Sequence, residues 1–393
     1  MRQAWRWFGP DDPVSLDAVR QAGAADIVTA LHDHAPGVPW TREAVAARKA
    51  LIENAPPGRT KLRWTVVESI PVADAIKREG AQARRDIEAW LASLEAVAAE
   101  GIRIVCYNFM PVVDWTRTDL DWPLPTGATA LRFDRDRFAA FDLFILQRPG
   151  AENDYDADAR ARAKRVFGAL SQDEADTLTR TIAAGLPGAT TDALDLAAFR
   201  ERLAAYRGLD AERVRANLVA FLAAVTPAAE ALGVKLTLHP DDPPAPLFGL
   251  PRVASTEADY AHLFDAVPSP ANGFCLCVGS LGVRADNDVV AITRRFASRI
   301  HFAHLRATKR DEGGFYEADH LDGDVDMIPV LQELLKEDRR RSKDEQIPFR
   351  PDHGHRMLDD LGKRTNPGYS AIGRLKGLAE LRGAIRTLER LEA

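Results

Sequence analysis

GVKLTLHP, at residues 233–240, is the stretch that decides the fold, because a short run of β-forming residues ends there in a histidine. Later runs repeat this form, and they read FCLC at 274–277, IHFAH at 300–304 and IPFRPDH at 347–353. Each run supplies one residue able to bind a metal ion, and these residues are His239, Cys277, His304 and Asp352. Strand ends that meet at one rim predict a single metal site at the top of a parallel barrel.

Eight short strands can be read along the chain, most of them rich in β-branched or aromatic residues. They cover residues 2–8, 26–31, 63–68, 103–108, 235–239, 273–277, 299–305 and 347–350. Helical patterns lie between them at 16–22, 41–53, 87–100 and 211–232, and the last two are followed by Gly101 and Gly233. Alternating strands and helices imply a parallel sheet, and eight strands imply a closed (β/α)8 TIM barrel in a single domain, residues 1–393.

The segment 112–208 interrupts this alternation between the fourth and fifth strands. It is far too long for an ordinary connection, so we interpret it as an insertion within the barrel domain with structure of its own. Residues 134–144 and 173–184 predict helices, while WTRTDLDWPLPTGATALRFD at 115–134 is either irregular or a small hairpin. We expect the insertion to cover the mouth of the barrel or to form a subunit contact, and we expect a homo-oligomer, most simply a dimer.

Ligand chemistry narrows the metal and separates the candidate ligands from their neighbours. Imidazole and thiolate together fit Mn, Fe, Co or Zn better than Mg or Ca. His301 points to the opposite strand face from His304 and is interpreted as structural. Cys275 and Cys277 share a face, and Cys277 is preferred because it comes later and precedes a turn; Cys275 and Cys106 are interpreted as core residues.

Further polar residues gather at the same rim and predict contacts with a substrate. Glu68 ends the third strand and Asn108 the fourth, while Arg306 follows a candidate ligand and could bind an anionic group. Asp241 and Asp242 follow His239 and could orient the imidazole ligands from behind.

The last part of the rim adds acid-base groups. His353 and His355 flank the fourth candidate ligand, and Tyr369 follows in TNPGYSAIGRLKGL. Together with a metal and an arginine, these groups suggest proton transfer on an anionic, hydroxylated substrate. His355 could instead fix a loop, and Tyr369 could be a packed aromatic residue.

Composition excludes several classes of protein. The formal charge of -6 disfavours a nucleic-acid binder, which needs a dense basic face. Three cysteines do not make a disulfide framework, so a reducing cytoplasm is expected. The start MRQAWRWFGP has no apolar signal region, and we expect no apolar stretch to be long enough to cross a bilayer. We therefore expect a cytoplasmic protein without a membrane partner.

The motifs resemble those of the D-mannonate dehydratase family of xylose-isomerase-like barrels, over essentially the whole chain. They are WRWFGPDDPVSL, DIVTALHDHAPGVPW, VVESIPV, YNFMPVVDWTRTDL, TLHPDDPP, GSLGVRADND, IHFAHLR, FYEADHLDGDVDM, RPDHGHRML and NPGYSAIGRLKGLAELRG. The segments ADAIKREG after IPV and LHDHAPG depart from the family pattern and bear on the rim or on specificity, but neither removes a ligand.

The resemblance implies a hydro-lyase that removes water from D-mannonate to give 2-dehydro-3-deoxy-D-gluconate, a step in hexuronate breakdown. It implies Mn²⁺ or Fe²⁺ at His239, Cys277, His304 and Asp352, with His353 and Tyr369 as acid and base in an order left open. The substrate-contact predictions remain Arg306, Glu68, Asn108 and His355. The alternatives are a metal-dependent sugar isomerase or epimerase, a metal-dependent nuclease and a non-catalytic sugar-acid-binding protein.

Overall fold

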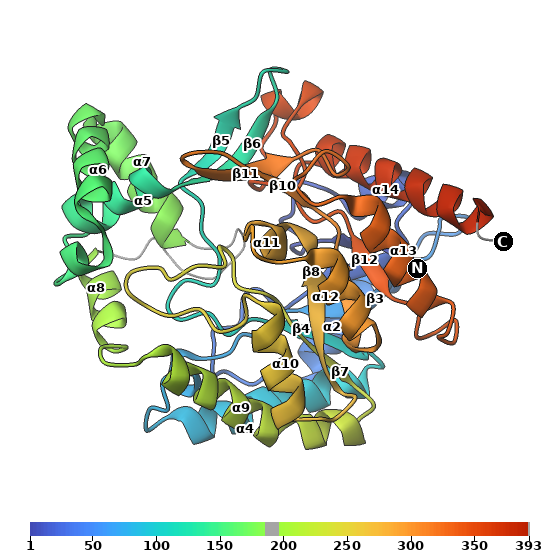
Figure 1. The fold of residues 1–393 in the computed structure, drawn as a ribbon. Helices are drawn as coiled ribbons and strands as arrows, with labels where there is room; N and C mark the ends of the chain where they lie inside the picture. Colours follow the sequence, from blue (N-terminus) through green and yellow to red (C-terminus); the bar gives the residue numbers. More distant parts are fainter. Residues whose placement is uncertain (185–195, 392–393) are drawn as a thin grey trace.

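A computed structural model, which describes residues 1–184 and 196–391, shows eight parallel strands closed into a barrel (Figure 1). In their order around the barrel the strands are β1 (Arg2–Arg6), β12 (Pro348–Arg350), β9 (Ile300–His304), β8 (Asn272–Cys277), β7 (Lys235–Leu238), β4 (Ile104–Tyr107), β3 (Arg63–Glu68) and β2 (Asp26–Thr29). β1 pairs with both β2 and β12, so the first and last strands close the sheet. All eight runs expected from the sequence are barrel strands, which confirms the predicted fold.

Helices surround the barrel, and their ends follow local sequence signals. They are α1 (Leu16–Ala22), α2 (Arg42–Glu53), α3 (Asp74–Lys77), α4 (Ala83–Ala99), α9 (Ala211–Ala231), α10 (Glu257–Ala266), α11 (Val278–Gly282), α12 (Val289–Phe296), α13 (Met327–Asp338) and α14 (Ala371–Leu391). The side chains of Ser15, Thr41 and Asp210 accept hydrogen bonds from the first turns of α1, α2 and α9. Gly23 ends α1 in the left-handed conformation that glycine adopts at little cost.

The side chains inside the barrel form layers. A middle layer of small and apolar residues consists of Ala4, Val28, Val66, Cys106, Cys275 and Phe302. Cys106 and Cys275 are therefore core residues, as predicted. On β3, β8 and β9 the next inward residues along the chain are Glu68, Cys277 and His304, all buried. On these three strands the interior thus changes from an apolar layer to a polar rim over two residues.

The insertion after β4 begins with a hairpin and continues as helices. Its elements are β5 (Asp119–Pro123), β6 (Thr129–Asp134), α5 (Arg135–Ala140), the π-helix η1 (Phe141–Ile145), the 3₁₀ helix η2 (Ala151–Asp154), α6 (Ala157–Ala169), α7 (Gln172–Ala184) and α8 (Leu196–Ala204). The helix expected at 134–144 is thus split, and the hairpin alternative for 115–134 is the one found. Residues 185–195 of the insertion lie outside the described residues. Figure 1 shows α5 to α8 standing to one side of the barrel.

A second hairpin, β10 (Ala307–Arg310) and β11 (Gly314–Ala318), follows β9 and was not expected. β11 pairs with β6, which gives a four-stranded sheet in the order β10-β11-β6-β5. Gly314 allows this approach, because a Cβ there would lie 1.9 Å from the carbonyl oxygen of Phe133. The insertion and the segment after β9 therefore build one accessory sheet.

α9 corrects the expectation that no stretch could cross a bilayer, because by length and composition alone this helix could. Its apolar residues are instead packed in the protein, since Val214, Leu218, Phe221, Leu222 and Val225 are all buried in the main core. α9 is therefore a barrel-covering helix that contacts α4 and β7.

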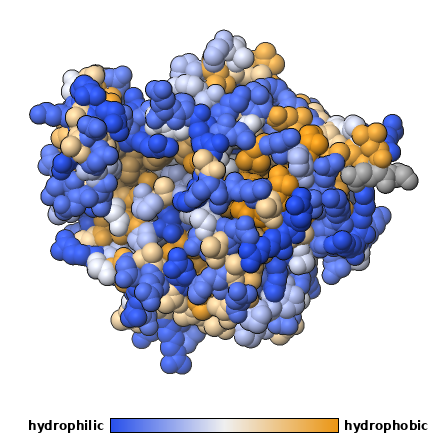
Figure 2. Space-filling model, in the orientation of Figure 1, coloured by the Kyte–Doolittle hydropathy of each residue, from blue (hydrophilic) through white to orange (hydrophobic). Residues whose placement is uncertain are grey.

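The face of the molecule drawn in Figure 2 is largely hydrophilic, with smaller groups of hydrophobic residues between the hydrophilic ones.

Candidate active site

Three of the predicted metal ligands converge at the rim. One ligand atom from each of His239, Cys277 and His304 lies within 4.8 Å of the other two. Nε2 of His239 is 3.1 Å from Nδ1 of His304, and the Ser280 hydroxyl lies 3.2 Å from the Cys277 sulfur. The ends of β7, β8 and β9 therefore supply a compact set of two imidazoles and one thiol.

This donor set fits one divalent transition-metal ion. Two nitrogens at ~2.1 Å from a common ion stand about 3.0 to 3.4 Å apart, close to the separation of the two rings. The remaining nitrogen of His239, Nδ1, is held 2.6 Å from the Pro240 carbonyl oxygen, while Nε2 of His304 faces Oε1 of Glu68 at 3.4 Å without a hydrogen bond among the described residues. Such partners fix the orientation of metal-binding imidazoles.

The protonation of the thiol also suits metal binding. Burial raises the pKa of Cys277, but the positive charges of Arg306 and His239 outweigh it and hold that pKa well below its usual range. Burial lowers the pKa of His239, whereas the Cys277 thiolate raises it to about 9. Cys277 is therefore a thiolate, the form of cysteine that binds metals.

Asp352, the fourth predicted ligand, lies beside this cluster. Its Oδ2 is 3.7 Å from Nδ1 of His304 and 2.8 Å from Nε of Arg306, and its Oδ1 also contacts the guanidinium of Arg350. Its backbone has a φ of 62°, in the left-handed region. Residues other than glycine are held there at a cost of about 1 to 3 kcal/mol, often at functional sites. Asp352 remains a predicted ligand, and its carboxylate is ion-paired with two arginines.

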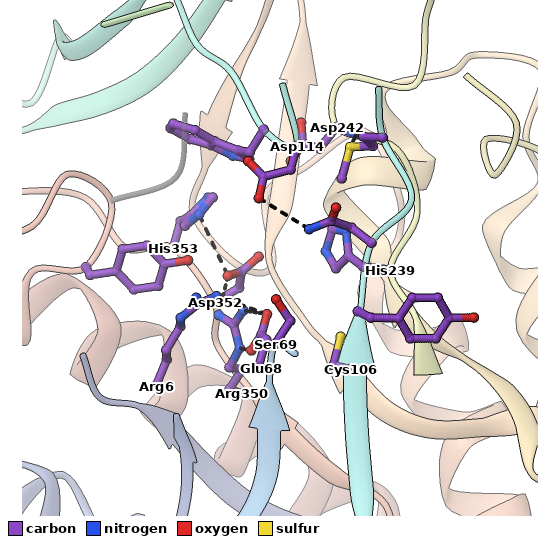
Figure 3. Close-up of a pocket in the computed structure, with 15 residues that line it drawn as sticks. Arg6, Glu68, Ser69, Cys106, Asp114, His239, Asp242, Arg350, Asp352 and His353 are labelled. Carbon is purple, nitrogen blue, oxygen red and sulfur yellow. Dashed lines mark hydrogen bonds and ion pairs between the residues drawn. The ribbon is translucent and has the colours of Figure 1, made fainter. Parts of the chain in front are cut away.

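A pocket opens over the ligands and unites most of the predicted site residues (Figure 3). The predicted residues that line it are Glu68, Asn108, His239, Asp352, His353 and Tyr369. His239 faces His353 across the pocket, while Arg6 and Arg350 lie beneath His353. The amide nitrogen of Asn108 is 3.3 Å from a carboxylate oxygen of Asp114.

His353 and Tyr369 form a pair on one wall of the pocket. Their rings meet edge to face with centroids 5.1 Å apart, and Trp115 contacts the His353 ring at 5.8 Å. Tyr369 is 1% exposed, and this burial raises its pKa to about 12. The phenol therefore keeps its proton at neutral pH.

Two predicted substrate contacts do not line the pocket. Arg306 is buried and its guanidinium is already bound, with Asp242, Glu317 and Asp352 as its partners. His355 has its Nε2 2.9 Å from the backbone oxygen of Glu317, so it fixes a loop. Both residues lie near the rim, as their positions in the sequence predicted. Their side chains, however, bind other protein groups and do not face the pocket.

The carboxylates after β7 also differ from expectation. Asp241 accepts hydrogen bonds from the backbone of Ala254 and from the Ser255 hydroxyl, and Asp242 pairs with Arg117 and Arg306. Neither contact orients an imidazole ligand. Instead, the Pro240 carbonyl and Glu68 lie next to the nitrogens of His239 and His304 that point away from the other ring.

Other pocket residues escaped the sequence interpretation. Arg6 on β1 pairs with Glu68 at 3.1 Å, and its Nε has no hydrogen-bond partner among the described residues. Asp114 and Trp115 enter from the start of the insertion. Inward alternation along β1, where Ala4 is in the middle layer, was the signal that could have placed Arg6 at the rim.

Fold and rim together define the class: a (β/α)8 barrel with a candidate metal centre beside a histidine-tyrosine pair. The family model for D-mannonate dehydratase (UxuA) matches residues 1–393, and the chain belongs to this family. Mannonate dehydratase from Brucella canis is 62% identical over 391 residues, covering 99% of this chain and 98% of that protein. The relative from Chromohalobacter salexigens is 55% identical over 395 residues, covering 100% of both.

Solved structures agree with this assignment. The crystal structure of mannonate dehydratase from Streptococcus suis serotype 2 matches with a TM-score of 0.78 at 32% identity, covering 100% of this chain and 94% of that chain. A D-tagatose 3-epimerase-like protein matches with a TM-score of 0.53 at 10% identity, covering 100% of both chains. The second likeness shows the shared barrel fold alone.

Proposed function

We propose that this chain removes water from D-mannonate to give 2-dehydro-3-deoxy-D-gluconate, a step of hexuronate breakdown. Family membership over the whole chain supports the reaction. The observation that carries it in the structure is that His239, a member of the His239–Cys277–His304 cluster, lines the same pocket as the His353–Tyr369 pair. Such a dehydration uses a metal ion to stabilise negative charge and an acid-base pair to move the two protons.

The metal proposed for the cluster is Mn²⁺ or Fe²⁺, held by His239, Cys277 and His304 with Asp352 as a fourth ligand. When bound, such an ion supplies a Lewis acid that stabilises the negative charge developing at the substrate carboxylate. Arg6 is the residue proposed to meet that carboxylate. It lines the pocket and pairs with Glu68, whereas Arg306 does not line the pocket and Arg350 is bound to both Glu68 and Asp352.

The raised pKa of Tyr369 favours one assignment of roles to the two acid-base residues. Because its pKa is raised to about 12, Tyr369 is protonated and is proposed to donate a proton to the departing C3 hydroxyl. His353 is then proposed to accept the C2 proton at a ring nitrogen. Water leaves with the C3 oxygen, and the resulting enol becomes the ketone. Each such group contributes on the order of 10² to 10⁴ to the rate.

One assay tests the reaction against its alternatives. The Mn²⁺- or Fe²⁺-loaded protein is incubated with D-mannonate, and a 2-keto-3-deoxy acid is measured. An aldose and an abasic-site DNA are tested in parallel. Formation of the keto acid is the expected result; turnover of the aldose or the DNA alone, or mannonate binding without turnover, would contradict it.

The cellular setting of this activity is proposed from composition. We propose a cytoplasmic homodimer whose partner molecule is a small sugar acid and which binds neither nucleic acid nor membranes. The acidic balance of the sequence supports the absence of a nucleic-acid partner, and its few cysteines support a reducing compartment.

A further inference from the structure

A buried carboxylate stands behind the catalytic pair. Glu317 lies on β11 of the accessory sheet, and both it and His353 are almost fully buried, at 3% and 4% exposed. Its Oε1 is 3.0 Å from Nδ1 of His353, 3.0 Å from Nη2 of Arg117 and 2.5 Å from Nη1 of Arg306. One carboxylate oxygen therefore receives an imidazole and two guanidinium groups.

The charge of Glu317 decides which imidazole nitrogen carries the proton. Burial raises the pKa of Glu317, but the charges of Arg306 and Arg117 and the hydrogen bond with His353 outweigh it, so this pKa is lowered and the carboxylate is ionised. An ionised carboxylate only accepts hydrogen bonds, so Nδ1 of His353 must donate. Neutral His353 then has its lone pair on Nε2, which stands 3.7 Å from Oδ1 of Asp352, beyond a hydrogen bond.

We propose that Glu317 is the positioning residue of the dehydration: it holds His353 as the Nδ1–H tautomer, with the Nε2 lone pair available to take the C2 proton. The inference rests on the proposed function and adds a residue to it. Glu317 does not line the substrate pocket, so it acts on the substrate through His353 and not by direct contact. A carboxylate that fixes the tautomer of a catalytic imidazole in this way is a recurring device in unrelated enzymes.

The accessory sheet and the segment before it hold Glu317 in place. Arg117, from the segment between β4 and β5, is completely buried and pairs with both Asp242 and Glu317. Its guanidinium lies over the rings of Trp115 and Phe315, at 4.7 and 4.9 Å. The insertion thus fixes the carboxylate, and the carboxylate fixes the imidazole.

The test compares Glu317→Gln with Glu317→Asp and with a matched control. Glutamine keeps the size but removes the charge, so kcat is expected to fall about 10²-fold while KM changes less than about threefold. Aspartate keeps the charge but holds it farther from His353, so the kcat of Glu317→Asp is expected to lie between those of the wild type and Glu317→Gln. Asp142→Asn is the control, because it removes another buried carboxylate that pairs with an arginine far from His353 in the insertion; its kcat is expected to stay at the wild-type value.

A spectroscopic readout separates positioning from a loss of structure. Nitrogen-15 spectra of histidine-labelled protein loaded with diamagnetic Zn²⁺, assigned with His353→Asn, are expected to show a protonated Nδ1 and a bare Nε2 in the wild type. Glu317→Gln is expected to lose that pattern. An unchanged tautomer, or a kcat within about threefold of wild type, would overturn the proposal.

Two further outcomes remain decisive. If Glu317→Gln does not fold, Glu317→Asp decides, and wild-type values of kcat and tautomer in that variant would overturn the positioning role. If the wild type does not dehydrate D-mannonate, the proposed function fails. The tautomer of His353 would then still show whether Glu317 positions the ring.

Discussion

At the scale of single residues, the choice between Cys277 and Cys275 is the sharpest prediction about the metal. Cys277 touches two imidazoles, whereas Cys275 belongs to the apolar layer below them. Cys277→Ala should therefore lower metal affinity by at least 10-fold, since a thiolate ligand is lost. Metal content after gel filtration measures this. Cys275→Ala is the matched control, and metal loss in that variant alone would reverse the assignment.

The acid-base pair gives a second residue-scale prediction. His353→Asn and Tyr369→Phe each remove a proton-transfer group, so turnover should fall by at least about 10²-fold. Metal content should stay close to one ion per chain, because neither residue belongs to the three-ligand cluster. Turnover of D-mannonate and metal analysis on the same samples check both statements. A variant with near wild-type turnover would remove its residue from the mechanism.

How well each site residue was predicted depended on the range of its contacts. His239, Cys277 and His304 were found because each ends a strand, which is a local property of the sequence. Glu317 and Arg117 were missed because they are 200 positions apart, and only the folded accessory sheet brings them together. Arg306 was predicted to contact substrate for a related reason. Its place after a strand locates its backbone, but the direction of its side chain depends on carboxylates that are distant in the sequence.

At the scale of elements, barrel strands were predictable and the accessory sheet was not. The barrel strands are apolar runs buried on both faces, a pattern that stands out in the sequence. β10 and β11 read ATKR and GFYEA, with charged side chains and glycines that resemble a loop. They form strands because β6, from the distant insertion, offers its edge. Tertiary pairing overrides weak local preference there.

Gly314 tests the closeness of that pairing. In Gly314→Ala the new Cβ would meet backbone rather than a flexible side chain, at 1.9 Å from the Phe133 oxygen, so β11 must shift. We expect a loss of about 1 to 3 kcal/mol in the free energy of unfolding, measured by denaturant titration. Gly383→Ala on α14 is the control, because nothing lies within 4 Å of its new Cβ and alanine favours a helix. Equal effects of the two substitutions would contradict a tight β11–β6 contact.

At the scale of the whole molecule, His301 predicts how stability depends on pH. The ring is buried at the lower end of the barrel, where Nε2 is 3.3 Å from the Pro270 oxygen, and burial lowers its pKa from 6.5 to about 3. The unfolded chain therefore takes up a proton near 6.5 while the folded chain does not. Stability from this group is complete above that value and is lost as the pH falls toward 3.

The expected size follows from the same difference in pKa. Between about pH 7.5 and about pH 5, His301 should reduce the free energy of unfolding by about 2 kcal/mol. His301→Asn removes this titration, so its stability should fall less over the interval, as measured by urea titration at each pH. The test is the difference in pH dependence of the free energy of unfolding between the wild type and His301→Asn. Other groups titrate in both proteins, including His239 with its raised pKa. Parallel pH profiles would mean that the ring protonates in the folded barrel as readily as in water.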